Sequence, residues 1–380
     1  MNKRLLIITC HKLDENNGGA NASKAIIHCF ASLFDDCSLI YPEFENTSHY
    51  IPSNYKLYPC HDSRTRLRKG IDMYRGVVGA LYYCVKAHLK EHQYDIIVID
   101  HSVTSTSLIR ILKRTGAKMI TIHHNVECTY LRDNGNERPI TYRIPYNFFA
   151  KKAERDSLRF SDVNLTLTEQ DAAVFRSWFN GICVRHWGTF QWQPIEEKIF
   201  TEKEVGQTFI ITGSLGFLQS QFPVSEFVRR YWPLVREVCK HARLIIAGRN
   251  PHQLLIEACA GQDDISIIPN PSDMGTLVEQ ADYYVCPINA GSGLKLRIMD
   301  ALKQGLPVLC HQVSAAGYEC MALNNGLFVY HEENSFKKAL RKLLVTKTSR
   351  QAIYQAYKKQ FSLEEGTTKL HTLLKEENII

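Results

Sequence analysis

The sequence of 380 residues has no apolar run of the roughly 20 residues that a membrane-spanning helix needs. Its first apolar run, residues 5–10, stops at His11 and is too short for a signal-peptide core, so it predicts a buried strand. The twelve cysteines stand singly, without a C-x-x-C pair or a metal-like cluster. This spacing argues against a disulfide framework and indicates reduced thiols. We therefore expect a cytoplasmic protein without a membrane span.

Other signatures are also missing. We find no low-complexity tract and no internal repeat, and nothing resembles an RNP, KH or helix-turn-helix motif, so nucleic acid is not an expected partner. A nicotinamide-binding fold would place G-x-G-x-x-G after a strand. Neither Gly18-Gly19 nor the stretch from Gly213 to Gly216 supplies that pattern. A nicotinamide-dependent oxidoreductase is therefore disfavoured.

Positive charge is concentrated in the first half of the chain. The net charge is +7, with 25 Lys and Arg against 19 Asp and Glu through residue 190, but 21 against 20 beyond it. The basic residues 64–69 precede Tyr74-Arg75 and an apolar stretch at 77–85. Such a segment suits contact with an anionic membrane or a phosphate-bearing acceptor, while the alternative is a solvated helix face.

Short β-branched runs alternate with helical patterns along the whole chain, which is typical of α/β proteins with parallel sheets buried on both faces. The expected strands are residues 5–10, 37–41, 95–100, 118–123 and 162–168, then 208–212, 243–247, 265–269, 283–287, 307–310 and 326–330. Gly and Pro between 187 and 194 indicate a connector and a candidate hinge. We predict an N-terminal domain at 1–190 and a C-terminal domain at 195–350, with a last helix, about 355–380, that packs back on the first domain.

The stretch INAGSGLKLRIMDALKQGLPVLC, residues 288–310, has the strongest functional signal. It predicts a strand, a glycine turn and a helix over 294–304, so free backbone N–H groups and the helix dipole would face an anion. Gly291 and Gly293 permit close backbone approach, and Lys295 in the first turn adds a positive charge. Asp300, about seven residues past the expected helix start, would lie roughly 10 Å along the helix. That spacing suits a nucleotide held by its phosphates and its ribose.

The segment GSGLKLRIMDALKQGLPVL resembles the donor-binding signature of GT-B nucleotide-sugar glycosyltransferases, the family 4-like group 1. Further similar stretches are residues 210–235, 242–251, 16–30, 121–132 and 161–175. The resemblance implies two Rossmann-like doubly wound domains facing a cleft, the first shaping the acceptor site and the second binding the donor. It implies a hexosyltransferase that retains anomeric configuration and needs neither metal nor cofactor. The acidic pairs at 35–36 and 263–264 also lack the Asp-x-Asp spacing of metal-dependent transferases.

The resemblance also assigns roles to residues. At the catalytic site it implies His124, which belongs to a His-Asn motif, with Glu127 and His123 beside it. For the donor it implies Gly18, Gly19, Gly213, Ser214, Arg249, Gly291, Ser292, Gly293, Leu294, Lys295, Arg297 and Asp300. The sequence departs from the family at two positions. Many members carry two glutamates eight positions apart, and here these are Ser292 and the shorter Asp300.

The expected reaction moves a sugar from a UDP- or GDP-sugar to the hydroxyl of a glycan or lipid-linked acceptor, in cell-surface polysaccharide synthesis. The basic first domain favours work at the inner face of the plasma membrane. Two alternatives keep the fold, a non-catalytic scaffold subunit and a sugar epimerase. The altered residues at 292 and 300 leave the scaffold open, and hydrolysis of a donor would distinguish an enzyme from it.

Overall fold

The computed structural model describes residues 3–380 except 16, 46, 78, 103–104, 135–139, 201–205, 292 and 325. The chain divides into two compact units. Unit 1 consists of Met1–Ile195, Ser292–Leu294 and Phe361–Ile380, and unit 2 of Glu196–Gly291 and Lys295–Gln360. The boundary between them thus follows Ile195, and each unit is built on its own sheet.

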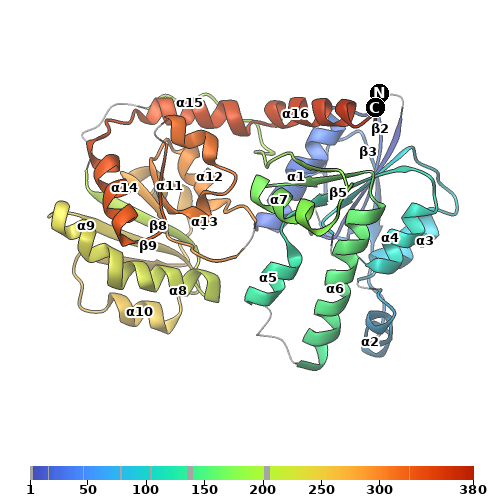
Figure 1. Cartoon of the computed structure of the whole chain (residues 1–380), viewed down its shortest axis with the longest axis horizontal. Coiled ribbons are helices and arrows are strands. Elements are labelled where there is room, and N and C mark those ends of the chain that lie inside the picture. The colour runs from blue at the N-terminus through green and yellow to red at the C-terminus, as the bar shows by residue number, and fades with distance from the viewer. Residues whose placement is uncertain are drawn as a thin grey trace. The chain divides into compact units, whose positions relative to one another are not determined.

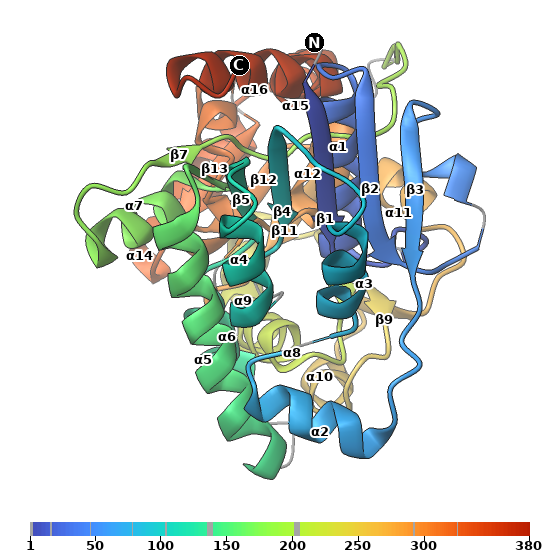
Figure 2. The same cartoon turned by 90° about the vertical axis from the view of Figure 1, so that its right-hand side faces the viewer.

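Unit 1 contains a seven-stranded parallel sheet with the order β3-β2-β1-β4-β5-β6-β7. Its strands are β1 (Arg4–Thr9), β2 (Asp36–Pro42), β3 (Tyr55–Cys60), β4 (Ile96–Asp100), β5 (Lys118–His123), β6 (Val163–Thr166) and β7 (Val184–His186). Figure 2 shows β1, β2 and β3 side by side. The strand order reverses between β1 and β4, which makes the crevice at their carboxyl ends the expected ligand position of a doubly wound sheet.

Helices cover both faces of this sheet. They are α1 (Gly18–Ala31), α2 (Arg66–Tyr74), α3 (Leu81–His88), α4 (Thr106–Lys113), α5 (Glu127–Asn134), α6 (Ile140–Phe160), α7 (Glu169–Trp178) and α16 (Leu363–Glu376), with a short 3-10 turn, Thr47–His49. Leu5 and Ile7 of β1 belong to one buried cluster, while Leu6 and Ile8 belong to another. Because successive side chains of a strand point to opposite faces, two-sided burial explains the continuous apolar run of β1.

The end of the chain belongs to unit 1. Leu370 and Leu374 of α16 join the core cluster that also contains α1, and Figure 1 shows the two helices side by side. The indole N–H of Trp187 donates to the carbonyl of Gly366 at 2.9 Å. The helix α15 (Arg350–Phe361) lies in unit 2 up to Gln360, so the chain enters unit 1 at Phe361.

Unit 2 contains a six-stranded parallel sheet with the order β10-β9-β8-β11-β12-β13. Its strands are β8 (Thr208–Ser214), β9 (Arg243–Arg249), β10 (Ile265–Pro269), β11 (Tyr283–Cys286), β12 (Val308–His311) and β13 (Leu327–Tyr330). Here the strand order reverses between β8 and β11. The prediction of two doubly wound parallel sheets is therefore confirmed.

The helices of unit 2 are α8 (Leu218–Glu226), a π-helical turn (Phe227–Tyr231), α9 (Trp232–Val238), α10 (Gln253–Cys259), α11 (Met274–Gln280), α12 (Arg297–Lys303), α13 (Gln312–Ala315), a 3-10 turn (Glu319–Asn324), α14 (Glu333–Val345) and α15. Trp232 and Phe336 are fully buried in the cluster between these helices and the sheet. Among the described residues, no helix is long and apolar enough to cross a bilayer.

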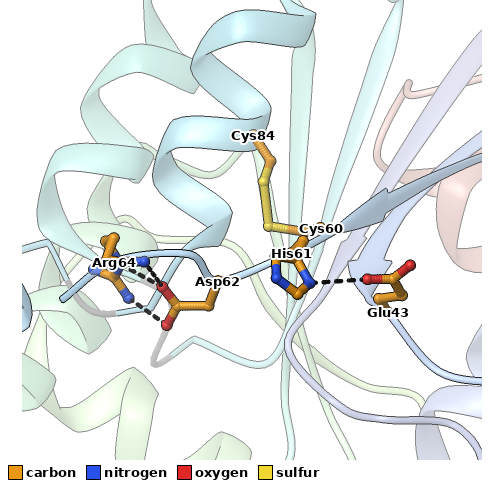
Figure 3. The surroundings of a disulfide bond; sticks show 6 residues. All are labelled: Glu43, Cys60, His61, Asp62, Arg64 and Cys84. Carbon is orange, nitrogen blue, oxygen red and sulfur yellow. Dashed lines mark hydrogen bonds and ion pairs between the residues drawn. A yellow bond between two sulfur atoms is a disulfide. The ribbon is translucent and has the colours of Figure 1, made fainter. Parts of the chain in front are cut away.

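One expectation about cysteine is wrong. Cys60, at the end of β3, forms a disulfide with Cys84 in α3, as Figure 3 shows, whereas the sequence predicted reduced thiols throughout. The two cysteines are 24 residues apart, a spacing without any local signal. Only the packing of α3 against the sheet brings them together. The remaining ten cysteines are free thiols.

Candidate functional site

Three histidines gather at the carboxyl edge of the unit 1 sheet. His11 follows β1, His101 follows β4 and His124 follows β5, and these three strands are neighbours in the sheet. The ring centroid of His11 lies 5.2 Å from the ring centroid of His101 and 5.2 Å from that of His124. The centroids of His101 and His124 are 5.1 Å apart. The cluster therefore occupies the position where strand order reverses, the usual ligand crevice of such a sheet.

Two buried carboxylates hold two of the rings. Nε2 of His124 lies 2.7 Å from Oδ1 of Asp100, and Nε2 of His101 lies 3.0 Å from Oε1 of Glu127. Burial alone would raise the pKa of Asp100, but the charge and hydrogen bond of His124 lower it well below its usual value. An ionised Asp100 can only accept, so Nε2 of His124 carries the hydrogen.

The second pair behaves in the same way. Burial opposes both charges, yet the pKa of Glu127 is lowered by His101, and the pKa of His101 is raised by Glu127. His101 also has a φ of 80°, in the left-handed region that non-glycine residues rarely adopt. Such strain persists where surrounding contacts fix the residue, and it is frequent at functional sites. The Glu127 contact supplies one such constraint.

His11 is a neutral imidazole near pH 7. Burial, with His124 and His101 next, lowers the pKa of His11 to about 3. Its Nε2 is buried and has no hydrogen-bond partner among the described residues. The ring lies against the backbone of Gly19, because a Cβ at that position would overlap it. Gly19 thus has a steric reason to be glycine, and Gly18 beside it is exposed at the start of α1.

A second layer supports Glu127. Oε1 of Glu154 accepts from the backbone N–H of Glu127 at 2.7 Å, and Oε2 accepts from Sγ of Cys128 at 3.0 Å. Burial raises the pKa of Glu154 to about 7, against the lowering effect of these hydrogen bonds. The carboxyl group therefore changes its protonation near neutral pH.

His123 lies apart from the cluster. Its Nε2 is 3.0 Å from Oδ1 of Asn164, and its ring packs 4.6 Å from that of Phe175. Burial lowers its pKa to about 4. Neighbouring residues of a strand point to opposite faces, so His124 faces the crevice while His123 faces the interior. The sequence did not single out His11, Asp100, His101 or Glu154, although three of these directly end or follow predicted strands.

In unit 2, Arg297 connects the start of α12 to the end of β8. Its guanidinium donates to the carbonyl of Thr212 at 3.1 Å and to Oγ of Ser220 at 3.3 Å. Gly213 has a φ of 145°, and a Cβ there would overlap the guanidinium. Ser214, at the end of β8, and Arg249, at the end of β9, lie at the same sheet edge.

The glycine loop differs from its prediction. Gly291 and Gly293 have φ values of 90° and 74°, as a tight turn requires, but α12 begins at Arg297 rather than at 294. Leu294 and Lys295 therefore precede the helix, and the placement of Lys295 in its first turn is wrong. Ser292 lies outside the described residues.

The N-terminus of α12 presents fewer free N–H groups than expected. The backbone N–H of Ile298 donates to Lys295, and those of Met299 and Asp300 donate to Leu296. These bonds satisfy donors that an anion would otherwise use. An anion at this loop would therefore depend more on cationic side chains than the sequence suggested.

Asp300 lies in the first turn of α12, not two turns along it. The separation from the helix start worked out from the sequence is therefore too long. The residue as a whole is exposed, but protein atoms around its carboxyl remove that group from water. This desolvation raises the pKa of Asp300 to about 6, against the lowering effect of Lys303 and Arg297. A carboxyl with a raised pKa can accept or share a proton with a hydroxyl near neutral pH.

Residues 207–346 match the family model described as Glycosyl transferases group 1. Solved structures share the fold over the whole chain. HepE of Anabaena, in complex with UDP, is 11% identical with a TM-score of 0.63, covering 98% of this chain and 100% of that one. WaaG, a glycosyltransferase involved in lipopolysaccharide biosynthesis, is 17% identical with a TM-score of 0.60, covering 97% and 99%. TarM is 11% identical with a TM-score of 0.67, covering 99% of both chains. No curated protein matches the sequence.

Proposed function

We propose that this chain moves a sugar from a nucleoside diphosphate to an acceptor hydroxyl. The proposal rests on its GT-B fold and on residues 207–346, which match the group 1 glycosyltransferase family. The carrying observation is the family match, which includes the glycine loop at Gly291 and the cations Lys295 and Arg297. The fold of HepE, which was solved with UDP, makes UDP the first donor nucleotide to test and GDP the second.

The donor diphosphate would lie at the carboxyl edge of the unit 2 sheet. Lys295, Arg297 and Arg249 can compensate its charge without a metal, since charge-assisted bonds from cationic side chains to phosphate are strong. Backbone at Gly213 and at the glycine loop would pass close to the phosphates. Asp300 would accept hydrogen bonds from the ribose. Stabilising charge on the leaving diphosphate is the main chemical requirement of the reaction.

In unit 1, His124 would contact the sugar or the acceptor. Asp100 fixes the orientation of its ring, and Glu127 with His101 offers a second hydrogen-bonding pair in the same cluster. Gly18 and Gly19 would let the loop before α1 approach the ligand. We propose retention of anomeric configuration, with the leaving phosphate taking the acceptor proton, on the basis of the family resemblance. NMR of the anomeric proton in the first-formed product tests it.

For the acceptor we propose a surface glycan or a lipid-linked precursor, and for the setting the cytoplasmic face of the plasma membrane. WaaG is described as acting in lipopolysaccharide biosynthesis. The basic excess of the first 190 residues is the feature of this chain that favours such an acceptor. Transfer to lipid-linked and to free oligosaccharide acceptors, measured side by side, distinguishes the two classes.

The experiment that tests the donor site is a thermal-shift screen with UDP, GDP, ADP and CMP in the presence of EDTA. A ligand at 100 times its Kd stabilises the fold by about 2.7 kcal/mol. We expect stabilisation by one nucleoside diphosphate that is lost in Lys295→Ala and Asp300→Ala but kept in Lys338→Ala, an exposed lysine on α14. Binding without hydrolysis of any sugar donor would favour the scaffold alternative. No stabilisation by any nucleotide would contradict the proposed function.

A further inference from the structure

Helix α2 has its polar side inward. Of its nine residues, only Asp72 is buried. Leu67, Ile71 and Tyr74 are 76%, 40% and 68% exposed, and their spacing of four and three residues places them on one helix face. A helix that buries a carboxylate and exposes its apolar face is not using that face for the core. The exposed face needs another explanation.

The inward side of α2 is firmly held. Asp72 accepts from Tyr83 Oη at 2.8 Å and pairs with Arg64 at 3.2 Å and with Arg68 at 3.1 Å. The Cys60–Cys84 disulfide joins the two ends of the chain segment that contains α2, as Figure 3 shows together with Arg64. The outward direction of the apolar face is therefore fixed by these contacts.

A second exposed apolar stripe lies on α6. Ile140, Ile144 and Phe148 of α6 are 62%, 62% and 61% exposed, and their four-residue spacing again defines one helix face. α2 contacts α6, and both figures show α2 next to the N-terminal part of α6. α2 follows β3, and α6 follows β5 and α5, so both come after the carboxyl ends of strands in the unit 1 sheet, the edge that carries the histidine cluster.

Basic residues occur in the same two segments as these stripes. Residues 62–75 contain five Arg and Lys against two Asp, and residues 140–152 contain three against none. Arg64, Arg68 and Lys69 pair with Asp62 or Asp72, so the exposed Arg66 and Arg75 carry the charge of the first segment that no acidic side chain among the described residues offsets. Exposed apolar side chains framed by basic ones are the pattern of helices that lie in the interface of an anionic membrane. A protein partner with an acidic apolar face is the competing occupant. The exposed basic residues, and the presence of apolar stripes on two neighbouring helices, favour a lipid surface.

We propose that the six apolar side chains of α2 and α6, with the basic residues around them, form a surface that rests on an anionic lipid bilayer. We call it the α2–α6 surface. It would hold the carboxyl edge of the unit 1 sheet, and with it His124, close to acceptors embedded in the membrane. The choice of lipid as partner rests on the proposed lipid-linked acceptor, but vesicle binding itself requires no transfer activity.

The test is co-sedimentation of the whole protein with vesicles of phosphatidylcholine, alone or mixed with phosphatidylglycerol. We expect binding to the mixed vesicles that falls as salt rises from 0.1 M to 1 M, because the Debye length shrinks from about 10 Å to about 3 Å. Replacing Arg66 and Arg75 by glutamine should weaken binding about five-fold for each basic side chain removed. Leu67→Gln with Tyr74→Gln should abolish the binding that remains at high salt.

Matched controls come from unit 2. Leu323 and Val345 are 89% and 78% exposed, so their glutamine variants remove comparable apolar surface elsewhere. Lys338→Gln with Arg341→Gln on α14 does the same for charge. Equal vesicle binding by the α2–α6 variants and these controls would overturn the proposal. So would a dimer of the unaltered protein in size exclusion that the α2–α6 variants lose, because the surface would then bind a second copy of the chain. Nucleotide stabilisation, measured on every variant, separates a failure of this surface from a failure of the donor site.

Discussion

The contact between Gly19 and His11 allows a sharp test of the histidine cluster. In Gly19→Ala the new Cβ would overlap Cε1 of His11 and lie 2.9 Å from its Nδ1. The ring cannot turn away freely, because the rings of His101 and His124 pack beside it at 5.2 Å. Overpacking of this kind costs about 1–3 kcal/mol. Replacing glycine near a helix start returns less than about 1 kcal/mol.

We therefore expect Gly19→Ala to destabilise the protein by about 1–2 kcal/mol in urea unfolding followed by circular dichroism, and to slow sugar transfer because the ring stacked on His124 moves. Gly70→Ala is the matched control. It lies inside α2 with no atom within 4 Å of the added Cβ, so we expect stabilisation by about 0.5–1 kcal/mol.

A double-mutant cycle completes this test. Adding His11→Ala removes the ring that the new methyl group meets, so the double variant should be less destabilised than the sum of the two single variants. Stabilisation by Gly19→Ala equal to that of Gly70→Ala, or strict additivity in the cycle, would refute the packing of His11 against the loop.

Three further outcomes are expected. Replacing Cys60 and Cys84 by serine should lower the free energy of unfolding by about 3.5 kcal/mol from chain entropy, with no effect of dithiothreitol on the variant. The pKa of Glu154 is raised to about 7, so the folded state binds more protons than the unfolded state above pH 4.5 and stability falls as pH rises to 7. Glu154→Gln should remove this loss of stability, about 3 kcal/mol in total between about pH 4.5 and pH 7, in urea titrations at several pH values. Arg297→Lys cannot keep both contacts, to Thr212 and Ser220, and should weaken nucleotide binding in calorimetry more than Lys303→Ala does.

The fold was largely predictable because buried parallel strands leave a strong local pattern. The resemblance to group 1 glycosyltransferases is confirmed by the family match over residues 207–346 and by the shared fold. Two strands were missed. β3 is buried only at Tyr55 and Cys60, and β7 spans three residues, Val184–His186. Both lie at the edges of the sheet, where a strand buries too little to need an apolar run.

The site was less predictable than the fold, because its members meet only through the order of the strands. Asp100, His101 and His124 come from two segments more than 20 residues apart, and β4 must pair with both β1 and β5 before His11 joins them. The Cys60–Cys84 pair has the same origin. The available signal was a polar residue at the carboxyl end of a predicted strand. Had we applied it to every strand, it would have selected His11 and His101.

The shortened α12 changes which groups would hold the proposed donor. A helix that began at 294 would offer unsatisfied N–H groups and its dipole to the phosphates, and a neutral loop could then suffice. Instead the first donors bond to Lys295 and Leu296, and Arg297 is already bound to Thr212 and Ser220. Under the proposed function, Arg297 would meet a phosphate from the position that these contacts fix, as a preorganised cation rather than a mobile one. Loss of the Lys295 charge should therefore affect donor affinity more than any change to the helix dipole.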